Sequence, residues 1–236
     1  MMTLLIGVNL GAFALIASDK REVAYVGGEV VYSTDDVDKI VSTKAGIITA
    51  CGAVDLLSPV KSRLSGMDVS NSDEILEVIT SERQRFKTAA AASPWSSYAL
   101  STTSWLLSYG TVNENDEPIV RLALYHPHLN ESLFSIIEQT FPIYPGGTSE
   151  SQASEWNEEI RGRMASLDYS AGTKSVLDQV ISHFGWLVDQ VAQVSPSVSR
   201  VFDVGIMTFD GVRAIARGVE PGGTYIFDDC SASSCG

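Results

Sequence analysis

The hydrophobic period of the chain first changes near Gly52, from strand-like to helix-like, and this change constrains the fold more than any other feature of the sequence. Before Gly52 the apolar residues form short strand-like runs, at 4–8, 12–17, 29–33, 39–42 and 46–50. Turn residues such as Asn9-Leu10-Gly11 separate these runs, which predicts an antiparallel meander. After Gly52 the apolar residues recur three and four positions apart, as on one face of a helix, at Val54, Leu57, Val60 and Leu64.

The remainder of the chain alternates between helix-like and strand-like segments. A second helix is expected from about Ser72 to Phe86, and Pro94 is expected to close it. The next runs favour strands, at 98–109, 119–125 and 133–137. Two more helices are expected at about 151–167 and 174–194, and the last two strands, 201–209 and 212–217, are joined at Asp210-Gly211, a strong hairpin signal.

This order favours an α+β fold, a four-layer αββα sandwich. Strands that come in hairpins make antiparallel sheets, and helices that come in pairs between them can cover the outer faces of two stacked sheets. We expect one domain over residues 1–225 and a flexible tail rich in serine and cysteine over 226–236.

Composition excludes several partners. The 29 acidic against 16 basic residues give a net charge of -13, which repels nucleic acid and anionic membrane surfaces. No apolar run is long enough to span a bilayer, so no membrane is expected. The three cysteines, Cys51, Cys230 and Cys235, do not make a disulfide framework, and a reducing cytoplasm is the expected location. No metal site or cofactor is predicted.

Thr3 is the candidate nucleophile. It opens the first strand behind Met1 and Met2. Aminopeptidases remove methionine before a small residue, so a start at Met2 would expose Thr3 directly, whereas a start at Met1 would require self-cleavage. Once exposed, the α-amino group of Thr3, with an ordinary pKa of about 7.7 to 8.0, can take the proton of its own hydroxyl.

The opening of the chain resembles that of proteasome-type β subunits and the related bacterial two-ring peptidases, which are N-terminal-nucleophile hydrolases. The resemblance rests on the strand that starts at Thr3, on Ala17-Ser18-Asp19-Lys20-Arg21, on Val37-Asp38-Lys39-Ile40, and on the turn from Ala50 to Asp55. The segment between Asp19 and Lys39 is longer than in that family, so residues 25–29 are expected to bulge out. Near the end, Ser195 to Ser199 stand where the family has an acid followed by a serine, and Asp203 is expected to lie within a strand.

The resemblance implies roles for eight residues. Thr3 would be the nucleophile, Lys39 would lower the pKa of its amine, and Asp19 would hold Lys39. The backbone at Cys51 and Gly52, at the start of a helix, would bind the oxyanion. Arg21, Ser197 and Ser199 would support the site.

The implied function is an N-terminal threonine hydrolase that cleaves peptide or amide bonds through an acyl-enzyme on Thr3. Peptides or unfolded proteins would be its substrates, and a homo-oligomer, such as a ring, would be its assembly. Two alternatives remain open: a non-catalytic shell or binding subunit, and a threonine-dependent transpeptidase or ligase.

Overall fold

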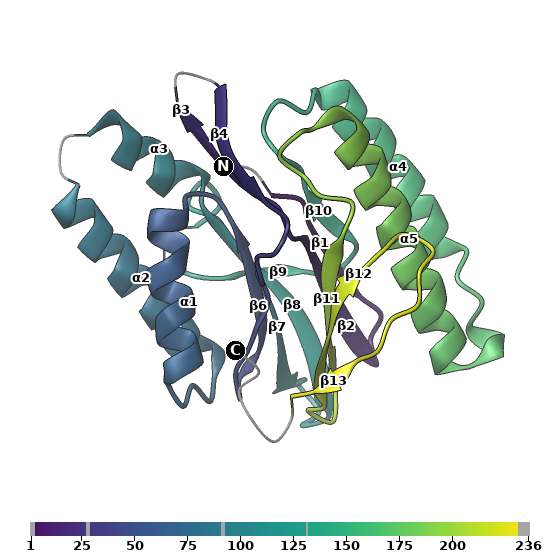
Figure 1. The fold of residues 1–236 in the computed structure, drawn as a ribbon. Helices are drawn as coiled ribbons and strands as arrows, with labels where there is room; N and C mark the ends of the chain where they lie inside the picture. Colours follow the sequence, from purple (N-terminus) through teal and green to yellow (C-terminus); the bar gives the residue numbers. More distant parts are fainter. Residues whose placement is uncertain (1–2, 27–28, 91–92, 131, 231–236) are drawn as a thin grey trace.

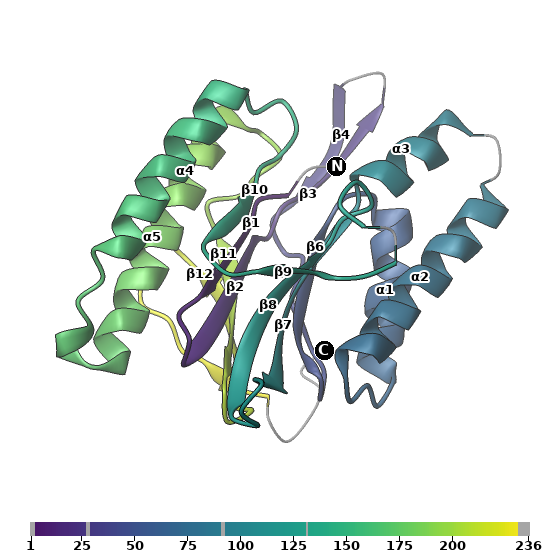
Figure 2. The ribbon, with the colours of Figure 1, turned by 180° about the vertical axis from the view of Figure 1, so that it is seen from behind.

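The computed structural model describes residues 3–26, 29–90, 93–130 and 132–230. Two antiparallel sheets lie face to face, and helices cover the outer face of each (Figures 1 and 2). The prediction of an α+β αββα sandwich is confirmed.

The first sheet carries the opening hairpin of the chain. Its strand order is β10-β1-β2-β11-β12-β13, and every neighbouring pair is antiparallel. The strands are β1 (Leu5–Asn9), β2 (Phe13–Asp19), β10 (Phe141–Ile143), β11 (Phe202–Thr208), β12 (Arg213–Val219) and β13 (Asp228–Asp229). β2 lies between β1 and β11 and is buried along its whole length, because a layer of helices covers one face of this strand and the second sheet covers the other.

The second sheet has the order β5-β6-β7-β8-β9 and faces the first. Its strands are β5 (Val41–Ser42), β6 (Gly46–Cys51), β7 (Ser104–Val112), β8 (Pro118–Tyr125) and β9 (Ser135–Ile137). The hairpin of β3 (Glu22–Val26) and β4 (Glu29–Thr34) belongs to neither sheet and projects from the sandwich (Figure 1). The expected bulge at residues 25–29 falls in this hairpin, and residues 27 and 28 of it lie outside the described part of the chain.

Two helix layers enclose the sheets. One contains α1 (Val54–Gly66), α2 (Ser72–Ala89) and α3 (Pro94–Thr102), and the other α4 (Glu150–Ala165) and α5 (Thr173–Val194), with a short 3-10 turn, η1 (Tyr169–Ala171), before α5. Local sequence sets where α2 and α4 begin. The Asn71 side chain accepts a hydrogen bond from the Glu74 amide, and Ser149 forms a capping box with Gln152.

The helix α3 is a correction to the sequence prediction, which placed residues 98–109 in one strand and Pro94 at the end of a helix. Pro94 instead occupies the first turn of α3, where its missing N–H costs nothing, and the strand begins at Ser104. The hydroxyl of Thr102 donates to the carbonyl of Tyr98 one turn back at 2.8 Å. Burial of Ser96 and Ala99 in the helix layer outweighs the strand preference of this segment.

Three apolar clusters hold the four layers together. One lies between the first sheet and α4 with α5, a second between the second sheet and α1 with α2, and the third between the two sheets. The middle cluster includes Leu5, Ile16, Leu106 and Leu122, all fully buried. The segment that bears Thr3 therefore starts at the edge of the central layer.

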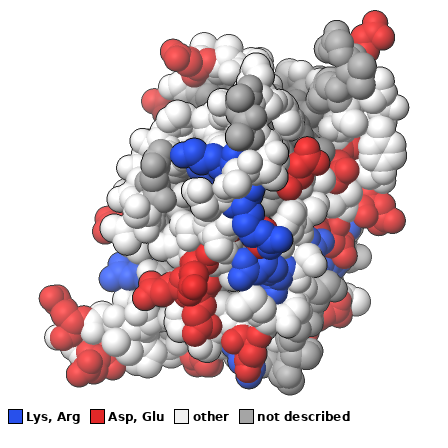
Figure 3. All heavy atoms as spheres, turned by 90° about the vertical axis from the view of Figure 1, so that its left-hand side faces the viewer, with Lys and Arg blue, Asp and Glu red and all other residues white. Residues whose placement is uncertain are grey.

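The net negative charge is not spread evenly over the surface. On the face formed by the α1, α2 and α3 layer, lysine and arginine gather in a stripe bordered by acidic side chains (Figure 3). Within this layer Glu82 is buried and accepts from Arg63 of α1 at 2.8 Å and from Arg85 at 3.0 Å. This ion-pair cluster joins α1 to α2.

The predicted flexible tail is ordered in its first part. Asp228 and Asp229 pair with β12, and Cys230 is fully buried and disulfide-bonded. The tail over 226–236 remains a prediction, because residues 231–236 lie outside the described part of the chain. The single domain over 1–225 remains a prediction. Within the described residues, no helix combines the length and the apolar character needed to cross a bilayer.

Candidate active site

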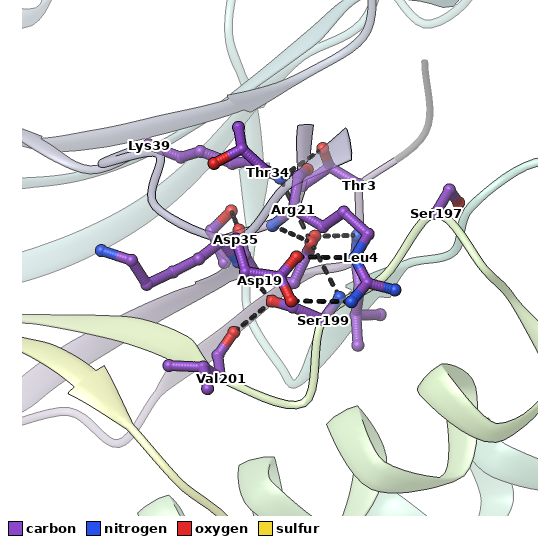
Figure 4. Close-up of polar contacts among 12 residues, drawn as sticks. Thr3, Leu4, Asp19, Arg21, Thr34, Asp35, Lys39, Ser197, Ser199 and Val201 are labelled. Carbon is purple, nitrogen blue, oxygen red and sulfur yellow. Dashed lines mark hydrogen bonds and ion pairs between the residues drawn. The ribbon is translucent and has the colours of Figure 1, made fainter. Parts of the chain in front are cut away.

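Thr3 lies two residues before the start of β1 and is 3 % exposed. The register of the β1–β2 hairpin, in which Leu5 opposes Ser18, brings the end of β2 beside it. There the amide of Leu4 donates to Asp19 Oδ1 at 3.0 Å, and the amide of Asp19 donates to the Leu4 carbonyl at 3.3 Å. Figure 4 shows Thr3 and Asp19 side by side as a result.

The Asp19 carboxylate is fully buried and is surrounded by N–H donors. Besides the Leu4 amide, its oxygens accept from the Arg21 amide at 2.8 Å, from Lys39 Nζ at 3.2 Å and from the Ser199 amide at 3.4 Å. A buried carboxylate with this many donors is held in one orientation. Asp19 is thus a fixed anchor for Lys39.

Lys39 stands in the irregular segment between β4 and β5, and its side chain is 10 % exposed. Its ammonium has three acceptors: Thr3 Oγ1 at 3.0 Å, Asp19 Oδ2 at 3.2 Å and the Arg21 carbonyl at 2.6 Å. Because an ammonium has three protons, this set satisfies it completely. Lys39 therefore donates to the Thr3 hydroxyl oxygen and leaves the hydroxyl proton free to go elsewhere.

Burial governs the pKa values of both charged groups. It raises the pKa of Asp19 against the opposing pull of Lys39 and of the backbone donors, and it lowers the pKa of Lys39 against the support of Asp19. We assign both groups as charged, since every proton of the ammonium and both oxygens of the carboxylate have partners.

Arg21 fixes the segment that carries Lys39. Its guanidinium contacts both carboxylate oxygens of Asp35, at 2.6 and 2.7 Å, and donates to the Pro196 carbonyl at 3.1 Å. This contact lowers the pKa of Asp35. Arg21 thus ties the base of the β3–β4 hairpin to the segment before β11.

The two predicted supporting serines differ in position. Ser199 is buried beside Asp19: its amide faces the Asp19 carboxylate, and its hydroxyl accepts from the Lys20 amide at 2.9 Å. Ser197 bonds instead to the Ser195 hydroxyl at 2.9 Å, and Figure 4 shows it apart from Thr3. Of the two serines, Ser199 contacts Asp19, whereas the Ser197 hydroxyl bonds to that of Ser195.

The turn at Cys51 and Gly52 leads from β6 into α1. Gly52 has a φ of +130°, and a Cβ there would lie 2.5 Å from the Thr103 Cα, so only glycine fits. The Thr103 hydroxyl accepts from the Ala53 amide at 3.1 Å and stabilises the turn. Cys51 is buried, and burial raises the pKa of its thiol to about 11, so the thiol is protonated at neutral pH.

A cavity of about 90 Å³ opens beside Thr3 and Lys39. Its wall is mostly apolar, with Val41, Ile48, Val54, Leu57, Leu64 and Trp105, while Glu22, Asp38 and Lys61 add polar groups. Its apolar wall comes from β5, β6, α1 and β7, so the second sheet and its helix layer form it. Such a cavity suits one apolar side chain of a substrate.

Sequence reasoning missed a group of charged residues behind Lys39. Lys20, Asp38, Asp203 and Arg217 form ion pairs with one another at 2.8 to 3.5 Å. Asp203 lies in β11, as expected, and is 1 % exposed. An acid inside an apolar strand, with an arginine across the Asp210-Gly211 hairpin, was the available signal.

The rings of His126 and His128 contact each other in a tilted arrangement, with centroids 5.3 Å apart and an angle of 35° between their planes. In the part of the chain that the structure describes, no three His, Cys, Asp or Glu side chains are grouped as metal ligands would be.

The four-layer sandwich, with a threonine at the start of its first strand, defines the class: a fold of the N-terminal-nucleophile hydrolase type. Comparison with solved structures agrees at the level of fold. The chain is similar to Anbu (ancestral beta-subunit) from Yersinia bercovieri, with a TM-score of 0.58 and 17 % identity over 87 % of this chain and 81 % of that one. It is also similar to Anbu from Hyphomicrobium sp. strain MC1, with a TM-score of 0.57 and 16 % identity over 97 % and 88 %. The chain is also similar to a helical assembly of the Anbu complex from Pseudomonas aeruginosa, with a TM-score of 0.57 and 13 % identity over 95 % of this chain and 87 % of that one.

These findings correct the family suggested by the opening motifs. The similar structures are Anbu proteins, which are distinct from proteasome β subunits, and neither a protein-family model nor a curated protein sequence matches the chain. The prediction of a proteasome-type β subunit or two-ring peptidase is therefore wrong. The motifs around Thr3, Asp19 and Lys39 are short, and so they do not separate one family from another.

Proposed function

We propose that the chain is an N-terminal threonine hydrolase acting on peptide or amide bonds. The observation that carries this proposal is the contact of Lys39 Nζ with Thr3 Oγ1 at 3.0 Å, backed by Asp19 at 3.2 Å, in a largely buried site. A threonine that served only as a strand former would have no need of a buried ion pair directed at its hydroxyl.

The reaction requires that residues 1 and 2 be removed, so that Thr3 has a free amine. Thr3 Oγ1 then attacks the substrate carbonyl, and its proton passes to the α-amine. Lys39, which remains charged, stabilises the forming alkoxide and lowers the pKa of the amine. The carbon–nitrogen bond breaks, the leaving amine takes the proton, and water hydrolyses the ester on Thr3.

The two remaining parts of the site fit the same chemistry. Backbone amides at Cys51 and Gly52 are the proposed oxyanion donors, since they precede the positive end of α1. The apolar cavity beside Thr3 is the proposed seat for a substrate side chain, which favours medium-sized apolar residues at the cleaved bond.

The test is covalent labelling of Thr3 by a threonine-directed electrophile, read by intact mass and peptide mapping. We expect one adduct, on a chain whose amino terminus is Thr3. Thr3→Ala and Lys39→Ala should each abolish it, while Thr111→Ala, at an exposed site on β7, should label like the wild type. Active protein with an intact Met2–Thr3 bond would refute the mechanism.

A non-catalytic subunit is the second candidate, and the position of Ser197 favours it. In the expected arrangement Ser197 would support Thr3, yet its hydroxyl bonds to Ser195. A folded chain that keeps residues 1 and 2 and takes no label would establish this alternative. A ligase would give the same adduct, and a peptide product formed when an amine nucleophile is added would identify it.

We also propose that the chain assembles into a homo-oligomer. One of the similar solved structures is titled a helical assembly, and the exposed apolar strand β4 provides a surface for contacts, with Val30, Val31 and Tyr32 between 48 and 60 % exposed. Size-exclusion chromatography with light scattering at micromolar concentration would detect the assembly, and a monomer under these conditions would contradict it.

A further inference from the structure

We propose that Arg217 is a positioning residue that sets Lys39 against Thr3; this inference rests on the proposed function. Lys39 lies in a segment without regular structure, so hydrogen bonds of a helix or sheet do not hold it. Side chains from elsewhere must fix the backbone on either side of it. Asp38 and Ile40 are the two residues concerned.

Arg217 contacts both neighbours of Lys39. Its Nη2 donates to the Ile40 carbonyl at 3.2 Å, and its Nη1 lies 3.5 Å from Asp38 Oδ1. Two further basic residues contact Asp38: Lys20 Nζ lies 2.8 Å from its carboxylate, and Lys61 donates to its backbone carbonyl. The backbone that carries Lys39 is thus held on both sides.

Asp203 holds Arg217 in turn. Asp203 Oδ2 accepts from Arg217 Nη1 at 3.1 Å, Oδ1 accepts from the Gly218 amide at 2.9 Å, and Lys20 Nζ lies 3.5 Å from Oδ1. Because Asp203 is 1 % exposed, its charge needs these partners. The buried acid therefore fixes the plane of the guanidinium.

A β-bulge explains why Arg217 points toward Lys39. Phe202 pairs with Val219 and Val204 pairs with Ala216, so Arg217 and Gly218 together oppose Asp203. Gly218 has a φ of +64°, the left-handed conformation that glycine supplies in such bulges. Bulges redirect side chains beside functional sites, and this one directs the Arg217 guanidinium toward the segment between β4 and β5 that carries Lys39.

The arrangement needs an arginine. A planar guanidinium can contact Asp203 and the Ile40 carbonyl at the same time through two nitrogens, whereas a lysine offers one. Arg217 contacts Asp203, the Ile40 carbonyl and Asp38; Asp38 belongs to the cavity lining, but Arg217 itself does not. Its effect on Thr3 therefore passes through the segment that carries Lys39.

The experiment compares Arg217→Met and Arg217→Lys with the full-length wild type. Arg163→Met is the matched control, since Arg163 is a partly exposed arginine in an ion pair on α4. We expect Arg217→Met to lower kcat, or the rate of Thr3 acylation, by roughly 10- to 100-fold, as a small misplacement of a catalytic group does. KM should change less than about threefold, because no substrate contact is lost. Arg217→Lys should recover part of the rate, and Arg163→Met should match the wild type.

The pH profile separates positioning from general loss of structure. Lys39 lowers the pKa of the Thr3 amine, so its displacement should move the acid limb of the rate profile to higher pH. If Arg217→Met folds poorly because Asp203 is left unpaired, the double variant Arg217→Met/Asp203→Asn removes that charge and should show the same shift. An unmoved acid limb in the folded variants would overturn the inference.

A crystal structure of the folded variant makes the result independent of catalysis. We expect Lys39 Nζ to leave hydrogen-bond distance of Thr3 Oγ1, and a retained contact would overturn the inference. A wild type that never acylates Thr3, together with a displaced Lys39 in the variant, would refute the proposed function alone.

Discussion

The Lys39 ammonium and the Asp19 carboxylate depend on each other at the residue scale. Asp19 is fully buried, and its oxygens accept from three backbone amides as well as from Lys39. Removal of the ammonium leaves a buried charge with dipoles alone to stabilise it. Stability and pH dependence can therefore report on the pair even without a substrate.

Lys39→Ala should lower the free energy of unfolding by about 3 kcal/mol at pH 7, because an unpaired buried carboxylate remains. Loss of Lys39 raises the pKa of Asp19 further above its ordinary value of 3.8. A raised pKa in the folded state gives stability at low pH that is lost as the pH rises through it. Urea unfolding at several pH values should show the deficit shrink as the pH falls toward 3.8. A deficit independent of pH would mean that Asp19 is not the group involved.

Cys51 gives a second prediction for a single side chain. Burial of the thiol raises its pKa to about 11, and the residue is 7 % exposed. Native protein at pH 7 should therefore alkylate at Cys51 at least about 100-fold more slowly than protein in denaturant, as the thiolate is both scarce and shielded. Mass mapping after iodoacetamide checks this. Rapid native labelling would make Cys51 a rival nucleophile.

At the scale of elements, Glu82 joins α1 and α2. Burial tends to raise the pKa of Glu82, but hydrogen bonds from Arg63 and Arg85 hold it below its usual 4.5. Both arginines are partly exposed, with side chains 37 and 74 % accessible, so solvent weakens each pair. The cluster therefore stabilises the packing of α2 against α1, the helix that lines the cavity, by a modest amount.

Glu82→Gln should cost about 1 to 2 kcal/mol of unfolding free energy at pH 7. Since the folded pKa is depressed, the contribution of Glu82 is present above pH 4.5 and is lost as the pH falls through the folded value. The difference between variant and wild type in urea unfolding should therefore vanish in acid. Glu77→Gln, at an exposed position of α2, is the control and should lie within about 0.5 kcal/mol of wild type.

At the scale of the whole molecule, the two halves of the sandwich each contain two tryptophans. Trp95 and Trp105 lie in the half with α3 and β7, and Trp156 and Trp186 lie on α4 and α5. The middle layer joins the halves through residues such as Leu106, which is fully buried. A single domain requires that both halves unfold together.

Variants that keep one tryptophan pair, with phenylalanine at the other, should give coincident urea transitions. Leu106→Ala should shift both transitions equally, by about 3 kcal/mol, since it opens a cavity in the shared layer. Two separated transitions, or a shift in one half only, would show that residues 1–225 are not one cooperative unit.

The sequence by itself determined the elements and the residues with chemistry. Periodicity and turn residues predicted the αββα sandwich, because each layer must bury one apolar face. The resemblance of the opening motifs made Thr3, Asp19 and Lys39 candidates. Short-range preference failed in α3, where burial of Ser96 and Ala99 outweighed it, and at Asp228–Asp229, which pair with β12 at the sheet edge.

Only the tertiary structure decided which groups act on Lys39. The β1–β2 register places Asp19 beside Thr3, and the β11–β12 bulge sends Arg217 toward the segment that carries Lys39. The contact between Arg217 and Ile40 alone joins positions that are 177 residues apart. Local sequence cannot encode them one by one, because they follow from strand pairing and from the need to neutralise the buried charge of Asp203.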